Sequence, residues 1–344
     1  RHHYLMMSTV ATLNNSYRLG AGEAPPAVMS VFSGSTLYRV FESILGIRNE
    51  DIAAVQDSIK IVNSIPEIFP DNTDRNRTSP FAFTGNRFEF RAVGASQNVA
   101  SAVYVLNTAV AESLNEFRTQ VDALEADGEE RSSAVMTVVR RFIEESKDIM
   151  FEGNGYGREW QAEARRRGLR AIENVPDTYE VYHEPAVVEM FDKLGVLAPN
   201  ELDARFEILN ETYVKKLQIE ARVIGDICLN HVIPAAVKYQ NTLIENVRGI
   251  KDIFGETYLT FCASEIETLK TISTSINSLS SYVDELVEAR KRANRVQNIA
   301  ERAKIYSHEV FELMGCVRTH ADNLEMLIDD EIWPLPKYRE LLFF

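Results

Sequence analysis

The sequence has few of the residues that mark secreted, metal-bound or membrane proteins. It contains only three cysteines in 344 residues, and Cys228, Cys262 and Cys316 are too scattered for a disulfide framework or a zinc motif. No apolar run is long and uncharged enough to predict a transmembrane helix. Basic residues are in deficit, with 37 Lys and Arg against 51 Asp and Glu, so the formal net charge is −14. We therefore expect a cytoplasmic protein that binds neither nucleic acid nor a membrane.

What the chain does have is a short segment in which charged residues alternate with phenylalanine. Residues 87–91 read Arg-Phe-Glu-Phe-Arg, and this period of two predicts a β-strand with the aromatic pair on one face. Arg87, Glu89 and Arg91 then share the other face. One interpretation is a solvated ladder of salt bridges. The other is a binding site, in which the carboxylate holds a cation and the guanidinium groups bind anions bidentately.

Two neighbouring features favour the binding site. Arg75 and Arg77 precede the strand, so four arginines gather in one part of an acidic chain. Residues 17–26 contain two glycines and two prolines, which make a regular helix or strand unlikely there. This loop presents Arg18 and Glu23 on irregular backbone, where binding and catalytic groups often lie. The alternative is a plain connecting turn.

Together these segments resemble glutamine synthetase, and specifically its type III branch. The resemblance is carried by Arg-Leu-Gly-Ala-Gly-Glu-Ala-Pro-Pro at 18–26 and by Asn-Arg-Thr-Ser-Pro-Phe-Ala-Phe-Thr-Gly-Asn-Arg-Phe-Glu-Phe-Arg at 76–91. The segments 183–191 and 333–344 also resemble type III sequences. The resemblance covers essentially the whole chain and is strongest in residues 1–100.

A type III enzyme would be about twice as long as these 344 residues, and the chain opens Arg-His-His-Tyr-Leu without an initiator methionine. The resemblance therefore implies a C-terminal piece of an enzyme. The missing part should include the N-terminal β-grasp domain, most metal-binding carboxylates and the metal-binding histidine. It also implies a ring-shaped homo-oligomer, a dodecamer in this family, with active sites between neighbouring subunits.

The resemblance implies ATP-dependent ligation of ammonia to glutamate through γ-glutamyl phosphate, which gives glutamine, ADP and phosphate. Arg18 and Arg91 would bind the glutamate substrate. Arg77 and Arg87 would contact the phosphates of ATP. Glu89 would be one ligand of Mg²⁺ or Mn²⁺, since hard divalent cations prefer carboxylate oxygens.

Two residues are expected to be catalytic by the same resemblance. Arg77 would stabilise the phosphoryl group during transfer, because this chemistry depends mainly on positive charge around the group. Glu23 would lie on a flap that closes over the acyl phosphate, excludes water and helps to take a proton from ammonium. Better-known bacterial members carry a further arginine five positions after the one matching Arg77. Here that position is Ala82, which puts the detail of the phosphate contacts in question.

Two other functions stay open. The chain could belong to a related γ-glutamyl ligase that joins a different amine to glutamate, although a flap glutamate favours ammonia. It could also be only a structural and assembly module. A single carboxylate, Glu89, cannot hold a metal cluster, so we expect this chain by itself to be inactive.

The apolar pattern predicts an α/β part followed by helices. Strand signals up to residue 91 and a helix at 96–120, with Val103, Val110 and Leu114 along one stripe, suit the closing half of the catalytic α/β barrel in residues 1–120. Residues 121–250 should form a helical region packed on it, interrupted at Pro234. Residues 251–344 should form a C-terminal helical extension and tail.

The C-terminal extension is predicted to be an antiparallel helical hairpin. Neither glycine nor proline occurs between Gly255 and Gly315, and two apolar ladders are separated by the basic cluster 290–292. Cys316 and His320 have the i, i+4 spacing of a metal pair, but a core cysteine beside a surface histidine is favoured because no third ligand is near. The glycine cluster 153–157 is interpreted as a turn, because no strand precedes it and no Lys-Ser/Thr follows it.

Overall fold

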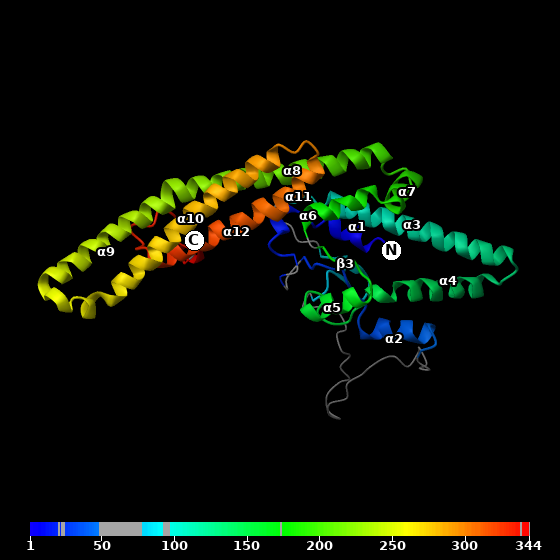
Figure 1. The fold of residues 1–344 in the computed structure, drawn as a ribbon. Coiled ribbons are helices and arrows are strands. Elements are labelled where there is room, and N and C mark those ends of the chain that lie inside the picture. Colours follow the sequence, from blue (N-terminus) through cyan, green and yellow to red (C-terminus); the bar gives the residue numbers. More distant parts are fainter. Residues whose placement is uncertain are drawn as a thin grey trace, which may run out of the picture. The chain divides into compact units, whose positions relative to one another are not determined.

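The computed structural model describes residues 1–19, 21, 25–47, 78–91, 97–172, 174–337 and 339–343. These residues are mostly helical, with one small sheet, and they divide into two compact units, Arg1–Phe206 and Glu207–Phe344 (Figure 1). The predicted α/β character followed by helices is confirmed at this level. That residues 1–120 form the closing half of a barrel stays a prediction, because the described residues contain a single three-stranded sheet.

The sheet of the first unit has the order β1-β2-β3, with β1 at Val31–Phe32, β2 at Phe81–Phe83 and β3 at Phe88–Phe90. β1 pairs with β2 in parallel, and β2 pairs with β3 as an antiparallel hairpin. The hairpin turn is closed by the Thr84 N–H, which donates to the Arg87 carbonyl at 2.8 Å. Gly85 supplies the positive φ of 92° that this turn needs.

The four phenylalanines of this hairpin lie on one face of the sheet. Phe81 stacks on Phe88 with ring centroids 5.5 Å apart and planes 12° apart, and it also contacts Phe90 at 6.0 Å. Phe83 contacts Phe88 at 5.2 Å. Aromatic cross-strand pairs of this kind fix the register of a hairpin. The predicted strand, with its aromatic pair on one face and its charges on the other, is confirmed.

In the described residues of the first unit the sheet is accompanied by several helices. They are α1 (His3–Ser8), α2 (Ser35–Ile44), α3 (Ala100–Ala126), α4 (Arg131–Ser146), α5 (Arg158–Arg166), α6 (Val175–Tyr179) and α7 (Pro185–Lys193). Two of them start at recognisable caps. The Glu130 side chain accepts from the Ser133 N–H at the start of α4, and the Asn174 side chain accepts from the Asp177 N–H at the start of α6.

The predicted helix after the strand is α3, but its apolar stripe faces solvent in this structure. Val103, Val110 and Leu114 are 50%, 48% and 65% exposed, whereas the buried positions of α3 are Val105, Thr108 and Val121. The packing partners of α3 within the first unit are α1, α4 and α7. These helices contact a neighbouring face of α3, so the predicted helix is confirmed and its apolar stripe lies exposed among the described residues.

A small core beside the sheet is centred on Trp160 of α5. Its side chain is fully buried, its indole N–H donates to the Val28 carbonyl at 3.1 Å, and its ring stacks on Phe151 at 4.7 Å. Val28 leads directly into β1, and Met150 forms a parallel bridge with Val31. Trp160 therefore joins α5 to two segments beside β1: the residues that precede this strand and the segment at Met150 and Phe151.

The glycine cluster 153–157 forms the predicted turn, and it also packs against the sheet. The Gly155 N–H donates to the Thr78 carbonyl at 2.7 Å. A Cβ atom at this position would lie 2.3 Å from the Ser30 hydroxyl oxygen and 3.1 Å from the Thr78 carbonyl oxygen. Such distances are too short for a carbon atom, so the backbone approach requires glycine.

We expect Gly155→Ala to lower the free energy of unfolding by about 1–3 kcal/mol, the usual cost of overpacking a tight site. Gly249→Ala is the matched control, because no atom lies within 4 Å of the Cβ that it would add to α9 (Ile233–Phe254). Alanine should be neutral or slightly stabilising there. Urea denaturation of both variants measures the difference, and equal stability would contradict the close approach at Gly155.

The described residues of the second unit form helices joined by turns, with no strand among them. α8 (Pro199–Ile227), which begins in the first unit, is followed by a π turn at Cys228–Val232 and then by α9. The expected interruption at Pro234 is confirmed. Proline offers no N–H to the carbonyl four residues earlier and its ring crowds that carbonyl, and a wider π turn is one way to accommodate it.

The predicted hairpin is confirmed in α10 (Leu259–Asn294), α11 (Ile299–Ile305), a second π turn (Tyr306–Val310) and α12 (Phe311–Leu327). α10 packs along α12, and it also runs back beside α9 (Figure 1). The Asn298 side chain caps α11 by accepting from the N–H groups of Ala300 and Glu301. The seam buries the apolar ladders Ile272, Leu279, Val283 and Leu286 on one side and Ala303, Tyr306, Val310, Val317 and Leu324 on the other.

Candidate active site

Three expected site residues come together on the exposed face of β3. Arg87 donates to Glu89 Oε1 from Nε at 3.2 Å and from Nη2 at 3.0 Å, and Arg91 Nη2 lies 3.6 Å from Glu89 Oε2. The Glu89 carboxylate is thus held between two guanidinium groups, as the alternation predicts. Their side chains are 68% exposed for Arg87, 36% for Glu89 and 17% for Arg91.

The electrostatics of this row favour an ionised Glu89. The hydrogen bonds from Arg87, together with the positive charges of both arginines, hold the pKa of the Glu89 carboxyl below its usual value. Because the group is solvent-exposed, the ion pairs contribute little to stability. The row can therefore exchange its internal ion pairs for a charged ligand at low cost, which suits a binding site as well as a solvated ladder.

Arg91 is the most firmly held of the three. Its Nη1 donates to the Ser79 carbonyl at 3.3 Å, and its backbone N–H donates to the Pro80 carbonyl at 2.7 Å. The Ser79 hydroxyl, fully buried, lies 3.3 Å from the Ser30 carbonyl and so ties this strand end to β1. The backbone and the guanidinium group of Arg91 are thus held in place, whereas the side chain of Arg87 is largely exposed to solvent.

The alanine that departs from the better-known bacterial pattern lies directly opposite the carboxylate. Ala82 is the cross-strand partner of Glu89 in the β2–β3 register, and it is fully buried in the central strand. A methyl group therefore occupies the position next to Glu89 where the bacterial pattern would place a guanidinium group. The positive charge on this face comes from β3 itself.

Glu152 is a further charged residue that sequence reasoning missed. Its Oε1 accepts from the Ser33 N–H at 3.0 Å and from the Ser33 hydroxyl at 2.6 Å, at the junction between β1 and α2. Its Oε2 is buried and finds no hydrogen-bond partner among the described residues. The only signal in the sequence is an acidic residue directly after the apolar run Ile149-Met150-Phe151.

The remaining expected residues are placed less completely. Arg18 is exposed in a turn that follows the short helix Leu13–Asn15, where its N–H donates to the Asn15 carbonyl at 2.9 Å. Glu23, Arg75 and Arg77 lie outside the described residues. The structure therefore brings together Arg87, Glu89 and Arg91, and the roles of Glu23 and Arg77 stay predictions.

A complete metal site is not formed by the residues that the structure describes. Among them, no group of three or more His, Cys, Asp or Glu side chains could hold an ion. Glu89 supplies one carboxylate, and its neighbours are arginines that repel a cation. The pair Cys316 and His320 also has no third ligand among the described residues. Both side chains are partly buried, and the His320 ring stacks on Tyr282 at 5.4 Å.

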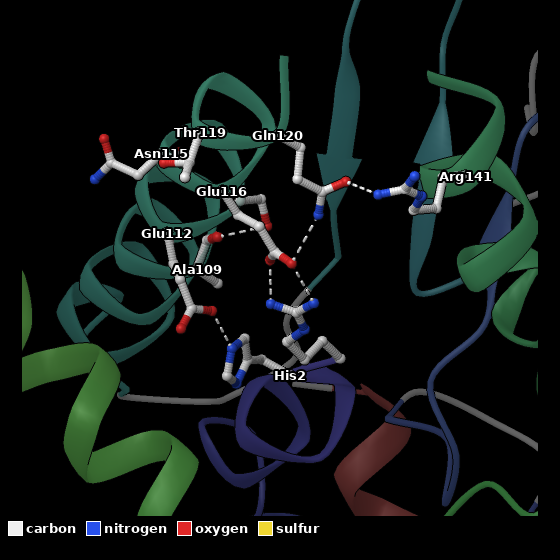
Figure 2. Close-up of polar contacts among 10 residues, drawn as sticks. His2, Ala109, Glu112, Asn115, Glu116, Thr119, Gln120 and Arg141 are labelled. Atoms are coloured by element: carbon white, nitrogen blue, oxygen red, sulfur yellow. Dashed lines mark hydrogen bonds and ion pairs between the residues drawn. The ribbon is translucent and has the colours of Figure 1, made fainter. Parts of the chain in front are cut away.

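A second polar cluster, on α3, serves a structural purpose (Figure 2). Arg1 forms a two-pronged ion pair with Glu116, and the His2 ring nitrogen lies 2.5 Å from Glu112 Oε2. Gln120 donates to Glu116 at 3.2 Å and accepts from Arg141 of α4 at 2.8 Å. Because both carboxylates already have a basic partner, this network joins the chain before α1 to α3 and α4.

Comparison with known proteins agrees with the motifs. Residues 134–251 match the family described as glutamine synthetase C-terminal domain. Over 98% of its length the chain is 44% identical to glutamine synthetase from Bacteroides fragilis (strain YCH46), of which it covers 47%. It is 36% identical over 99% of its length to type-3 glutamine synthetase from Dictyostelium discoideum, covering 46% of that protein.

A third relative, glutamine synthetase from Butyrivibrio fibrisolvens, is 31% identical over 98% of this chain and is covered to 47%. The chain spans about half the length of the curated relatives it matches, and it aligns with their C-terminal half. The resemblance drawn from the motifs is confirmed. No helix in the described ranges is long and apolar enough to cross a membrane.

Proposed function

Since this chain belongs to the glutamine synthetase family and corresponds to its C-terminal half, we propose that it supplies part of the active site of an ATP-dependent glutamate–ammonia ligase. The observation that carries the proposal is the row Arg87, Glu89 and Arg91 on β3. The enzyme would form γ-glutamyl phosphate from glutamate and ATP, and ammonia would displace the phosphate to give glutamine.

Each residue of the row has a geometry that supports its proposed role. Arg91 is only 17% exposed and is anchored at Ser79, so its guanidinium group is held in a fixed position, which suits binding of a substrate carboxylate. Arg87 is 68% exposed and can turn from Glu89 towards a nucleotide phosphate. Arg18 would bind the other end of glutamate, and Arg77 and Glu23 would act in phosphoryl transfer and flap closure.

Glu89 is proposed as one ligand of Mg²⁺ or Mn²⁺, and its low pKa keeps it ionised at neutral pH. One carboxylate beside two arginines does not make a metal site. The other ligands would therefore come from outside the described residues, and we assign no chemical step to a metal on the basis of this chain.

The partners proposed for the chain follow from the family. They are glutamate, ammonia and ATP as substrates, the N-terminal half of the same enzyme, and neighbouring subunits of a cytoplasmic ring, a dodecamer. The exposed stripe of α3 at Val103, Val110 and Leu114 supports packing against further sequence, because apolar side chains in a row are costly to leave in water. In the division proposed here, 1–120 is catalytic, 121–250 packs on it and 251–344 extends it.

One assay distinguishes the proposed function from the two alternatives, a γ-glutamyl-amine ligase and an assembly module. We expect the complete protein, including any sequence beyond residues 1–344, to form glutamine from glutamate, ATP and ammonia, and the purified 1–344 chain alone to form none. Activity only with larger amines such as ethylamine would assign it to a γ-glutamyl-amine ligase. No activity with any amine would leave an assembly module, and glutamine formation by the 1–344 chain would contradict the divided site.

A further inference from the structure

In the second unit, two helices bring together a pair of arginines for which the described residues supply no acidic partner. Gln218 of α8 donates to Asn294 Oδ1 of α10 at 3.2 Å. Arg222 lies one helical turn after Gln218, and Arg290 lies one turn before Asn294. If α8 and α10 run antiparallel, both arginines reach the same level of the interface.

Two contacts further along show that the helices are antiparallel. Gly225 of α8 faces Val283 of α10, since a Cβ at Gly225 would lie 3.6 Å from the Val283 side chain. Gln240 of α9 donates to the Ser273 hydroxyl of α10 at 2.7 Å. Later positions in α8 and α9 thus meet earlier positions in α10, and this register places Arg222 opposite Arg290.

The charge of this pair is not balanced by an ion pair within the described part of the chain. In the described residues neither Arg222 nor Arg290 forms an ion pair, although Lys291 and Arg292, the next residues of α10, pair with Glu288 and Glu309 at 2.7 Å. Burial, followed by the charge of Arg222, lowers the pKa of Arg290, and the Tyr306 phenol acts weakly in the opposite direction. Like charges held together in a strongly acidic protein indicate that an anion completes the cluster.

The neighbouring polar groups supply one further donor for such an anion. The Asn294 Oδ1 atom accepts from the Gln218 amide and from the Tyr306 hydroxyl, the latter at 2.8 Å. Tyr306 is fully buried on the second π turn, so its hydroxyl fixes the orientation of the Asn294 amide. Its Nδ2 group then points away and donates to no described residue. Two guanidinium groups and one amide N–H₂ remain available.

We propose that Arg222, Arg290 and Asn294 form a binding site for a phosphate group on the second unit. Two guanidinium groups at one level match a doubly charged tetrahedral oxyanion better than a single carboxylate, and Arg binds phosphate through paired hydrogen bonds. Arg222 is exposed and Arg290 partly exposed, so a ligand can enter from solvent. The source is either inorganic phosphate or a phosphate ester. All three residues belong to the second unit, whereas the charged row on β3 belongs to the first.

The test compares Arg222→Gln and Arg290→Gln with the control Arg292→Gln, which removes an arginine paired with Glu309 from the same helix. Isothermal titration with inorganic phosphate at constant ionic strength should show binding weakened about tenfold or more in the first two variants, because each loses a charge-assisted contact. Hydrogen exchange of peptides covering residues 286–310 locates the effect. AMP in a parallel titration distinguishes a phosphate ester from the free anion.

The proposal requires phosphate or AMP to protect residues 286–310 in the unmodified protein and in Arg292→Gln, and to lose this effect in both other variants. Equal protection in all four proteins, or none in the unmodified protein, would overturn it. Without ligand, Arg290→Gln should melt no earlier than Arg292→Gln, since no ion pair is lost. Earlier melting would show that Arg290 has a structural partner and would also overturn the site.

Discussion

Glu89→Ala in the complete protein is expected to reduce glutamine synthesis by more than about a hundredfold. The substitution removes the one carboxylate on the charged face of β3, and with it the ion pairs that align Arg87 and Arg91. Loss of an outer partner of a metal ligand typically costs 10- to 100-fold in activity or affinity, so loss of a proposed ligand should cost more. Initial rates at saturating glutamate, ATP and ammonia measure the effect.

The chain offers a matched control for this experiment. Glu163 of α5 also accepts from two arginines, Arg166 and Arg167, and these hydrogen bonds lower the pKa of its carboxyl to about 2. Glu163→Ala should leave the rate within about twofold, since Glu163 is proposed for no role in catalysis or binding. If Glu89→Ala behaved like Glu163→Ala, the row on β3 would be a solvated salt-bridge ladder, and its assignment as a site would be wrong.

Trp160→Ala is expected to produce the largest loss of stability, about 3–5 kcal/mol in the free energy of unfolding of the first unit. The indole is fully buried, it stacks on Phe151 at 4.7 Å, and the Arg167 guanidinium lies 5.5 Å from its ring centroid. Removing it leaves a cavity between α5 and the sheet and deprives the Val28 carbonyl of its donor. Chemical denaturation followed by circular dichroism measures the loss.

The two tryptophans of the chain allow a sharper comparison. Trp160→Phe keeps most of the volume and loses the hydrogen bond to Val28, so a cost of about 1–2 kcal/mol is expected. Trp333→Phe should cost less from hydrogen bonding, because the Trp333 indole N–H has no partner among the described residues. In each variant the remaining tryptophan lies in the other unit, so its fluorescence reports the stability of the unit that was not changed. Equal destabilisation by both changes would contradict the role of the Val28 contact.

Local sequence patterns were sufficient for much of this protein. Alternation at 87–91 predicted β3, the face shared by its aromatic residues and the row Arg87, Glu89 and Arg91, because side chains in a strand alternate strictly. Three- and four-residue spacing predicted α3 and the hairpin of α10 with α12, and Pro234 predicted the break before α9. The same motifs identified the family, which the relatives confirm.

Tertiary structure decided what periodicity cannot express. A helical pattern shows which residues share a face, but the neighbours determine whether that face is buried, and so the apolar stripe of α3 lies exposed among the described residues. Local sequence does not reveal which distant segments meet, such as Glu152 with Ser33 or Gly155 with Thr78. Arg222 and Arg290 are likewise far apart in the sequence. They lie at the same level only because of the register of the antiparallel helices α8 and α10.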